Sequence, residues 1–268
     1  MKKFFAQCYI WLLLIVLYAP IVFIAIFSFT ESKVLGNWTG FSTKLYSNLI
    51  TGDMQGTGSL MSAIENTLII ALVAAVVSTV LGTIAAIGIH NMRGKSKQAM
   101  IMLNNVPMLN PDIITGVSLF LLFVFLHISQ GYFTVILAHI TFCTPYVVLN
   151  VLPKLTPMNP NIYEAALDLG ATPFQALKKV LLPLLKPGMI SGFILAFTMS
   201  LDDFAVTFFT RGTIGLDTLS TYIYTDARKG GLTPELRPLI TLMFVGILVL
   251  LIVVNIRNIK NAKKAVEK

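Results

Sequence analysis

Charged residues are scarce in this chain of 268 residues. They make up 12% of the sequence, against about 25% in ordinary soluble domains, whereas hydrophobic residues make up 56%. This balance excludes an ordinary soluble domain. Six apolar runs are long enough to cross about 30 Å of hydrocarbon as helices. They are residues 8–29, 64–89, 99–126, 133–152, 189–209 and 239–256. The sequence predicts an all-α integral membrane protein with six transmembrane helices in a single domain over residues 1–268.

Cysteine and histidine are also rare. Cys8 and Cys143 lie far apart in apolar segments, which indicates neither a disulfide framework nor a metal knuckle. His90, His127 and His139 lie on different segments without the spacing of metal ligands. We therefore expect buried thiols and no metal site.

The sequence lacks a catalytic constellation as well. No nucleophile is paired with a base, and the stretch GIHNMRGKS at 88–96 has five residues between its glycines where a phosphate-binding loop has four. That stretch follows a predicted membrane helix instead of a strand, which favours a basic turn. We predict no catalytic residues and no cofactor in this chain, so any ATP that drives it must be hydrolysed by another protein.

Basic residues are unevenly distributed around the predicted helices. With the N-terminus inside, 14 of them lie in inner segments, namely Lys2, Lys3, Arg93, Lys95, Lys97, Lys154, Lys178, Lys179, Lys186, Arg257, Lys260, Lys263, Lys264 and Lys268. The outer loops hold the other 6, namely Lys33, Lys44, Arg211, Arg228, Lys229 and Arg237. Because basic loops favour the cytoplasm, both termini are predicted to be cytoplasmic. The same placement explains the net charge of +8 without a nucleic-acid partner.

The first apolar run follows Lys2 and Lys3, as it would in a signal peptide. Its length exceeds the 7–15 apolar residues of a signal peptide, and no A-x-A cleavage site follows it. We predict a retained transmembrane helix.

A less apolar segment at 154–187 interrupts the series of membrane runs. Asn159 and Pro160 form an N-cap and first-turn pair, which predicts a short helix that ends near Leu169. Gly170 then supplies the left-handed residue that closes such a helix.

A second helix start follows at Thr172 and Pro173. Apolar residues recur beyond it at helical spacing, and we expect Pro183 and Pro187 to end this helix. The two helices are predicted to lie at the cytoplasmic membrane surface. Their periodicity leaves two interpretations open: an amphipathic connector that rests on lipid headgroups, or an element that docks on a partner.

Two acids and two small residues mark the first of these helices. Glu164 and Asp168 are four residues apart and share a face, and the small Ala165 and Ala166 let a partner approach closely. The spacing E-A-A, three residues, G, nine residues, an aliphatic residue, one residue and L-P resembles the EAA loop of permease subunits in bacterial ATP-binding-cassette importers. The matching residues are Glu164, Ala165, Ala166, Gly170, Val180, Leu182 and Pro183, with valine where isoleucine is usual.

The resemblance implies a MetI-like, type I importer permease whose six helices enclose half of a translocation path. In that family the EAA loop lies in a groove of a cytoplasmic ATPase. The ATPase-coupling residues implied here are Glu164, Ala165, Ala166, Asp168 and Gly170. Glu164 would face basic or donor groups on the ATPase, and Gly170 would set the angle between the two coupling helices.

Three acids lie inside the predicted spans. With span ends and loops excluded, they are Asp112, Asp202 and Asp203, and no Lys or Arg within a span is available to neutralise them. A charge inside the membrane costs about 2.5 to 3.5 kcal/mol on insertion scales, so these acids are candidates for a substrate path. Asp202 and Asp203 are expected on one helix about 100° apart, and therefore unequally directed. An interior that holds only acids favours a cationic passenger.

Asp112 follows Asn110 and Pro111 inside an apolar run. At 1.5 Å per residue it lies about 20 Å from the cytoplasmic start of that run. A helix broken near the midplane is typical of a substrate path. The alternative is that Asp112 only caps the second half-helix, whose dipole favours an acid at this end.

Four stretches resemble the PotC-type permeases of spermidine/putrescine importers. They are NWTGFSTKLYSNL (37–49), HITFCTPYVV (139–148), EAALDLGAT (164–172) and FTMSLDDFAVTFF (197–209). The resemblance covers nearly the whole chain. It implies polyamine transport across the bacterial cytoplasmic (inner) membrane, together with an ATP-binding-cassette ATPase dimer, a second, PotB-type permease and an extracytoplasmic polyamine-binding protein. Polyamines are linear polycations, which agrees with the interior acids.

Residues of the last outer loop are candidates for contact with that receptor or with substrate. Tyr222 and Tyr224 offer rings to a cation near the carboxylate of Asp226, although interfacial anchoring of the tyrosines is equally open. Related permeases carry iron, thiamine, phosphonate or sugars, so another small solute stays open. A secondary transporter is less favoured because the sequence contains one clear N-P-D break and no matched second one. A non-transporting scaffold would not need the interior acids.

Overall fold

The computed structural model describes residues 2–52, 57–159, 161–213, 215–229 and 232–266. Within these residues the secondary structure is helical and contains no strand, which confirms the predicted all-α class. The contacts divide the chain into two compact units: unit 1 is Met1–Leu60 with Tyr222–Lys268, and unit 2 is Met61–Thr221. The single permease domain over residues 1–268 stays a prediction.

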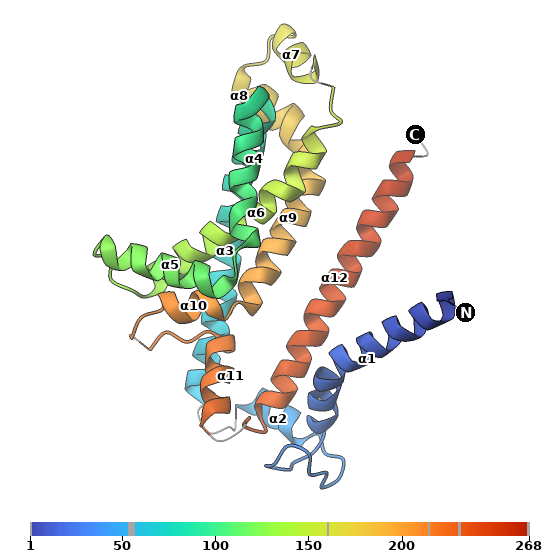
Figure 1. Ribbon diagram of the computed structural model, residues 1–268, viewed down its shortest axis with the longest axis vertical. Coiled ribbons are helices and arrows are strands. Elements are labelled where there is room, and N and C mark those ends of the chain that lie inside the picture. Colours follow the sequence, from blue (N-terminus) through green and yellow to red (C-terminus); the bar gives the residue numbers. More distant parts are fainter. Residues whose placement is uncertain (1, 53–56, 160, 214, 230–231, 267–268) are drawn as a thin grey trace. The chain divides into compact units, whose positions relative to one another are not determined.

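Unit 1 is built mainly from helices near the two termini. They are α1 (Lys2–Phe27), α2 (Lys44–Thr51), most of α11 (Leu219–Arg228) and α12 (Leu236–Val266). Helices α1 and α12 meet near α2 and diverge towards the termini (Figure 1). The rings of Tyr18 and Phe244 meet edge to face, with 6.4 Å between their centroids.

A buried arginine joins the start of α12 to the segment after α1. The Arg237 side chain is fully buried, and its guanidinium donates hydrogen bonds to the carbonyl oxygens of Ser32, at 2.8 Å, and Lys33, at 3.1 Å. The prediction that Arg237 lies in an outer loop is wrong, because it lies in the first turn of α12. A buried charge requires such hydrogen-bond partners, and two loop carbonyls supply them.

Unit 2 holds the centre of the chain. Its helices are α3 (Thr57–Asn91, apart from its first turn), α4 (Gly94–Leu109), α5 (Asp112–Phe125), α6 (Tyr132–Leu155), α7 (Asn161–Asp168), α8 (Pro173–Ala176), the π-helical η1 (Leu177–Leu181), α9 (Leu182–Asp202) and α10 (Ala205–Thr210). Figure 1 shows α7 and α8 at one end of this unit, and α10 towards the other. The segment at 154–187 and the break between α9 and α10 are therefore well separated within this unit.

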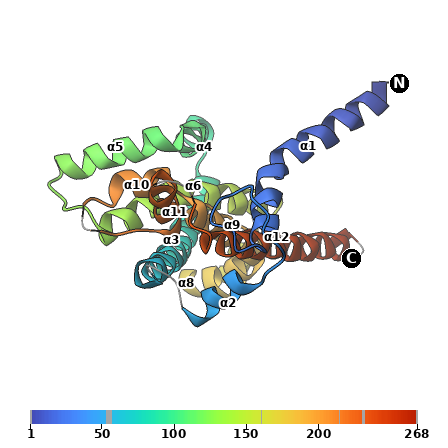
Figure 2. The same cartoon turned by 90° about the horizontal axis from the view of Figure 1, so that it is seen from below.

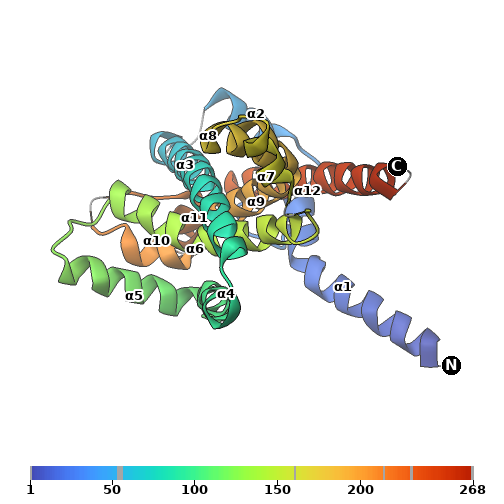
Figure 3. The same ribbon diagram turned by 90° about the horizontal axis from the view of Figure 1, so that it is seen from above.

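Helix α6 is central to the packing of unit 2 and lies beside α9 (Figures 1 and 3). The contact is close because α9 presents glycines to α6. A Cβ atom added to Gly188 would lie 2.8 Å from the Asn150 carbonyl oxygen, and one added to Gly192 would lie 3.1 Å from Val147 Cγ1. Helix α3 approaches the same residue of α6, because a Cβ atom added to Gly82 would lie 2.7 Å from Val147 Cβ. Small residues thus let three helices approach closely.

Within the part of the chain that the structure describes, five helices are long and apolar enough to cross a membrane, and the pair α4 and α5 makes a sixth span if it is counted as one. The two helices of this pair meet at an angle of 104°. The six predicted apolar runs therefore correspond to five long helices and one sharply bent pair.

The predicted run at 189–209 is not one helix. Helix α9 ends at Asp202, and α10 begins at Ala205. Asp203 between them is extended, with φ −60° and ψ 131°, and its carboxylate accepts hydrogen bonds from the amides of Val206 and Thr207. A side chain that caps a new helix in this way ends the old one. The expectation that Asp202 and Asp203 lie on one helix is therefore wrong.

The prediction that Pro183 and Pro187 end a helix is wrong too. The helix that starts at Pro173 continues through both prolines to Asp202. The π-helical turn η1 precedes Pro183, and the amide of Leu182 donates to the Leu177 carbonyl five residues earlier. The wider turn accommodates a residue that lacks an N–H and crowds the carbonyl four positions before it.

Candidate functional site

The first part of the site is the break between α4 and α5. Asn110 and Pro111 are both extended, with ψ values of 134° and 138°, and α5 begins at Asp112. The ring of Pro111 clashes with a helical conformation of the residue before it, Asn110, which explains why α4 ends at Leu109. Figure 1 shows α5 running crosswise to α4. The predicted broken helix at Asn110, Pro111 and Asp112 is confirmed.

The break directs α5 onto α10, which lies beside it in Figures 2 and 3. A Cβ atom added to Gly116 of α5 would lie 3.1 Å from the Ala205 carbonyl oxygen and 3.2 Å from Val206 Cα. Asp112 lies one turn before Gly116. Asp202 ends α9 just before α10 begins at Ala205. Two helix breaks that are about 90 residues apart in sequence therefore meet.

The three candidate acids have different surroundings. Asp112 and Asp202 are exposed, whereas the side chain of Asp203 retains only 7% of its accessible surface. Asp112 is also within electrostatic range of Tyr146 on α6. Within the described part of the chain, no Lys or Arg forms an ion pair with any of the three acids. Among the described residues, Asp112 and Asp202 are therefore exposed carboxylates without a basic ion-pair partner, and their role in a substrate path stays a prediction.

Asp203 has its partners inside the chain. Its Oδ2 accepts the amide and the hydroxyl of Thr207, each at 2.8 Å, and its Oδ1 accepts the Val206 amide at 3.2 Å. His139 Nε2 lies 3.4 Å from the same Oδ2. The backbone carbonyl of Asp203 accepts the Ser220 hydroxyl at 2.5 Å. This acid shapes the start of α10, and its direct contact with a substrate stays a prediction.

His139 is a residue of the site that sequence reasoning missed. Its spacing from the other histidines speaks only against a metal site, yet it lies fully buried on α6 and contacts both sides of the break between α9 and α10. A signal for it was present, because an ionisable side chain inside an apolar run calls for a partner inside the membrane. Asp203 was the acid available for that role.

The nearest arginine is engaged elsewhere. Arg211 follows α10, forms an ion pair with Asp217 and lies with its guanidinium 5.3 Å from the centroid of the Phe208 ring. The Asn66 side chain donates to the Asp217 carbonyl at 2.9 Å, and the Tyr132 hydroxyl bonds Asn66. This network ties the segment after α10 to α3 and α6, and the pairing with Asp217 compensates the arginine charge locally.

The segment at 154–187, called the coupling segment below after the role predicted for it, has the predicted helix-turn-helix form. Asn159 Oδ1 accepts the amide of Asn161 at the start of α7, while Pro160 lies outside the described residues. Gly170 has φ +86°, the left-handed value expected of it. Thr172 and Gln175 then form a reciprocal capping box at the start of α8. The predicted N-caps at Asn159 and Thr172 and the glycine turn are confirmed.

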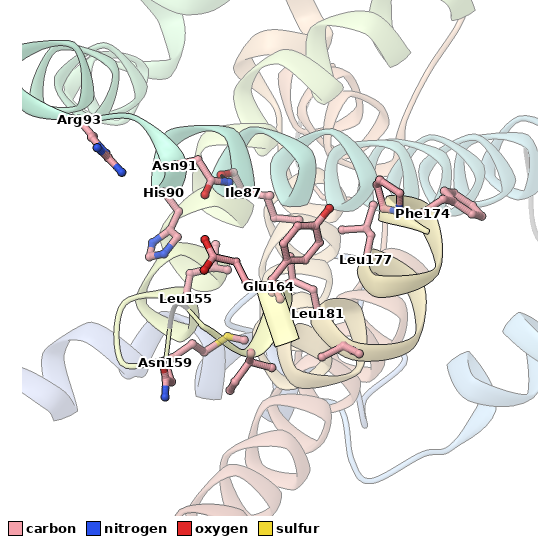
Figure 4. Close-up of a pocket in the computed structure, with 15 residues that line it drawn as sticks. Ile87, His90, Asn91, Arg93, Leu155, Asn159, Glu164, Phe174, Leu177 and Leu181 are labelled. Atoms are coloured by element: carbon pink, nitrogen blue, oxygen red, sulfur yellow. Dashed lines mark hydrogen bonds between the residues drawn. The ribbon is translucent and has the colours of Figure 1, made fainter. Parts of the chain in front are cut away.

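A cavity of about 760 Å³ lies between this segment and the end of α3. Glu164 projects into it from α7 towards His90 of α3 (Figure 4). Around the turn, Leu169 and Phe174 expose 89% and 70% of their surface. Ala165, Asp168 and Gly170 are exposed and Ala166 is half-buried. The segment thus presents both an apolar and an acidic surface.

The last outer-loop candidates lie on α11. The Asp226 carboxylate accepts the amide of Thr233 at 2.8 Å and its hydroxyl at 2.7 Å. Tyr224 is exposed, with the Arg228 guanidinium 5.8 Å from its ring centroid, and Tyr222 is half-buried. Asp226 therefore closes a local turn, and contact of these three residues with a receptor or substrate stays a prediction.

The family model described as "Binding-protein-dependent transport system inner membrane component" matches residues 78–259. The chain belongs to this family. It is accordingly a multi-pass inner membrane protein, and a transport subunit of the permease type instead of the subunit that hydrolyses ATP.

Curated relatives extend the match beyond that model. The putrescine transport system permease protein PotI of Escherichia coli K12 is 39% identical over 234 residues, which cover 85% of this chain and 81% of the relative. The spermidine/putrescine permease PotC of the same organism is 37% identical over 236 residues, covering 88% and 87%. PotC of Haemophilus influenzae is 36% identical over 246 residues, covering 91% and 93%.

Solved structures agree on the fold. A chain of a bacterial ABC transporter that imports the acidic polysaccharide alginate superposes with a TM-score of 0.67 at 14% identity, over 97% of this chain and 95% of that chain. A chain of the inward-facing MetNI methionine transporter gives a TM-score of 0.60 at 19% identity, over 79% and 99%. The predicted MetI-like permease fold is confirmed.

Proposed function

We propose that this chain forms half of the translocation path of an ATP-driven importer for polyamines such as putrescine and spermidine. The observation that carries the proposal is the pair of exposed carboxylates, Asp112 and Asp202, at two helix breaks that meet in unit 2. The relatives named for putrescine and spermidine transport, which match most of the chain, support the same class of passenger.

The geometry suits a passenger with at least two positive charges. Each carboxylate is a place where an ammonium group is stabilised, and two neighbouring acids repel each other until cations lie beside them. Asp202 is the last residue of α9, whose C-terminal carbonyls carry the negative end of the helix dipole. A diamine or triamine therefore gains charge and dipole interactions that a neutral or anionic solute lacks.

The proposed partners are an ATPase dimer, a second homologous permease of the PotB type, and an extracytoplasmic substrate-binding protein. The exposed acids and apolar residues of the coupling segment suit docking on the ATPase. A transporter with a similar fold was solved in complex with a periplasmic protein bound to alginate pentasaccharide, which supports a receptor for the present system. ATP-driven closure of the ATPase dimer would then move the segment and reorient the path.

We also propose that both termini are cytoplasmic. Arg93, which lies between α3 and α4, lines the same cavity as Glu164, which agrees with the assignment of both to the inner side. Single cysteines introduced at Gln175 and Ser42 give a test with membrane-impermeant thiol reagents. We expect labelling of the first only from the cytoplasmic side and of the second only from outside. External labelling at Gln175 would overturn the orientation.

The passenger is tested by radiolabelled uptake in cells that lack other polyamine importers and express the complete complex. We expect uptake of putrescine or spermidine, and about a tenfold loss in Asp112→Asn and Asp202→Asn, since an amide keeps the shape but removes the charge. Iron, thiamine and phosphonate are the comparison solutes. No polyamine uptake by the unaltered complex, or undiminished uptake in both variants, would contradict the proposal.

A further inference from the structure

We propose that His139 is a positioning residue for the substrate cation: it fixes the break between α9 and α10 through Ser200, Thr207 and Asp203, and thereby sets the direction of Asp202. This inference rests on the proposed function, because it needs Asp202 to face the passenger. His139 itself is fully buried on α6, so it acts on the substrate through other residues.

The imidazole of His139 joins the two helices that the break separates. Its Nδ1 lies 2.6 Å from the Ser200 hydroxyl on α9, two residues before Asp202. Its Nε2 lies 2.9 Å from the Thr207 hydroxyl on α10 and 3.4 Å from Asp203 Oδ2. Ser200 and Thr207 are themselves buried. One rigid ring therefore holds both sides of the interruption.

The donor and acceptor roles in this set follow from the Asp203 carboxylate, which can only accept hydrogen bonds. The Thr207 hydroxyl donates to Asp203 Oδ2, so its oxygen is left to accept from the Nε2–H of His139. In the neutral ring this places the acceptor at Nδ1, where the Ser200 hydroxyl donates. Every polar group of this buried set is then satisfied. Loss of the ring nitrogens leaves two buried hydroxyls without their partner, which is unfavourable.

The same set fixes the backbone on which Asp202 ends α9. Asp203 is bonded through both carboxylate oxygens to the start of α10, and through its carbonyl to the Ser220 hydroxyl. Asp202 precedes it directly and is exposed, within electrostatic range of Asp112. A shift of Asp203 is therefore transmitted across one peptide bond to the side chain that faces the cation.

The test compares three variants of the complete complex. His139→Phe keeps the volume of the ring and removes both nitrogens, while His139→Gln restores a donor at the far end of the side chain. Cys143→Ala is the matched control, because Cys143 is equally buried one turn along α6 and its Sγ contacts the Ala196 carbonyl at 3.4 Å. Each variant is measured for putrescine and spermidine uptake, relative to the amount of assembled complex in the membrane.

We expect about a tenfold loss of uptake in His139→Phe, partial recovery in His139→Gln, and less than about a twofold loss in Cys143→Ala. The decisive measurement is a double-mutant cycle with Asp202→Asn. If His139 acts through Asp202, His139→Phe costs less than about twofold once Asp202 is neutralised. A loss of about tenfold in both backgrounds, or no recovery with Gln, would show a general structural role and overturn the proposal.

The remaining outcomes also decide. If His139→Phe does not assemble, His139→Gln is carried through the same cycle, and failure of both variants to assemble would assign the residue to folding and overturn the inference. If the unaltered complex takes up no polyamine, the proposed function fails and the inference falls with it. Polyamine uptake by the unaltered complex with unchanged rates in both His139 variants would overturn the inference alone.

Discussion

The two ends of unit 2 interrupt their helices in different ways. At the coupling segment, Gly170 turns the chain with φ +86°, and the next helix starts from a capping box formed by Thr172 and Gln175. At the break after Asp202, the interruption is held by His139 from another helix. A turn closed by neighbouring residues keeps its form when it moves as a body, whereas a break held by a distant side chain moves with that helix. The turn at Gly170 therefore suits a segment that moves as a rigid body, and the break after Asp202 suits a binding site.

The largest effect is expected from a substitution that breaks the local turn. In Gly170→Val the left-handed backbone becomes strained by about 1 to 2 kcal/mol, and nothing lies within 4 Å of the added Cβ to complicate this. We expect about a tenfold or greater loss of uptake. Gly170→Asn is the control, since Asn tolerates this conformation and should retain most of the transport. Equal loss in both variants would contradict a purely conformational effect.

Reversing the charge on the coupling helix tests the docking surface. Glu164→Lys is expected to lower uptake about fivefold to tenfold, because repulsion replaces attraction at the ATPase surface, whereas Glu164→Gln should cost less. Transport is to be measured together with the amount of ATPase that co-purifies. Normal co-purification and substrate-stimulated ATP turnover in the Lys variant would remove Glu164 from the interface.

Substitutions of Asp203 and Asp202 distinguish a residue that positions the start of α10 from one that contacts the substrate. Asp203→Asn replaces an acceptor of the α10 start by a donor, so we expect about a fivefold loss of uptake and a lower melting temperature of the purified complex. Asp202→Asn should lower uptake with the melting temperature unchanged. Both quantities can be measured on the same preparations. A melting temperature that falls only in Asp202→Asn would reverse the roles assigned to the two residues.

The smallest effect is expected at the capping box. Thr172→Ala removes the hydrogen bond that the Gln175 backbone amide donates to the Thr172 hydroxyl oxygen, a loss of about 1 kcal/mol. Helix α8 continues through η1 into α9, which holds it in place, so uptake should fall by less than about twofold. The rate of uptake at saturating substrate measures this directly. A loss as large as that of Gly170→Val would show that the cap, and not the glycine, maintains the turn.

Local patterns predicted most of the coupling segment and the first helix break. The caps and the turn of the coupling segment depend on Asn159, Gly170 and Thr172, which contact residues only a few positions away. Pro111 likewise disfavours the helical conformation of its neighbour Asn110. The membrane-spanning helices could also be predicted from the sequence, because a long apolar run is stable in hydrocarbon and not in water. Pro183 and Pro187 led to a wrong prediction of a helix end, because the sequence did not reveal the π-helical turn η1 that accommodates the first of them.

The chain's own composition and short motifs therefore decided its membrane class, its coupling segment and the acids that lie in its spans. The bonds from the Val206 and Thr207 amides to Asp203 are local, whereas only the tertiary structure decided how the break after Asp202 is held and that Asp202 remains exposed. Those outcomes depend on His139, which is 61 residues from Ser200 and 68 from Thr207. Arg237 is a parallel case, since it bonds a carbonyl 205 residues away. Contacts at such separations arise from packing, and no local pattern in the sequence encodes them.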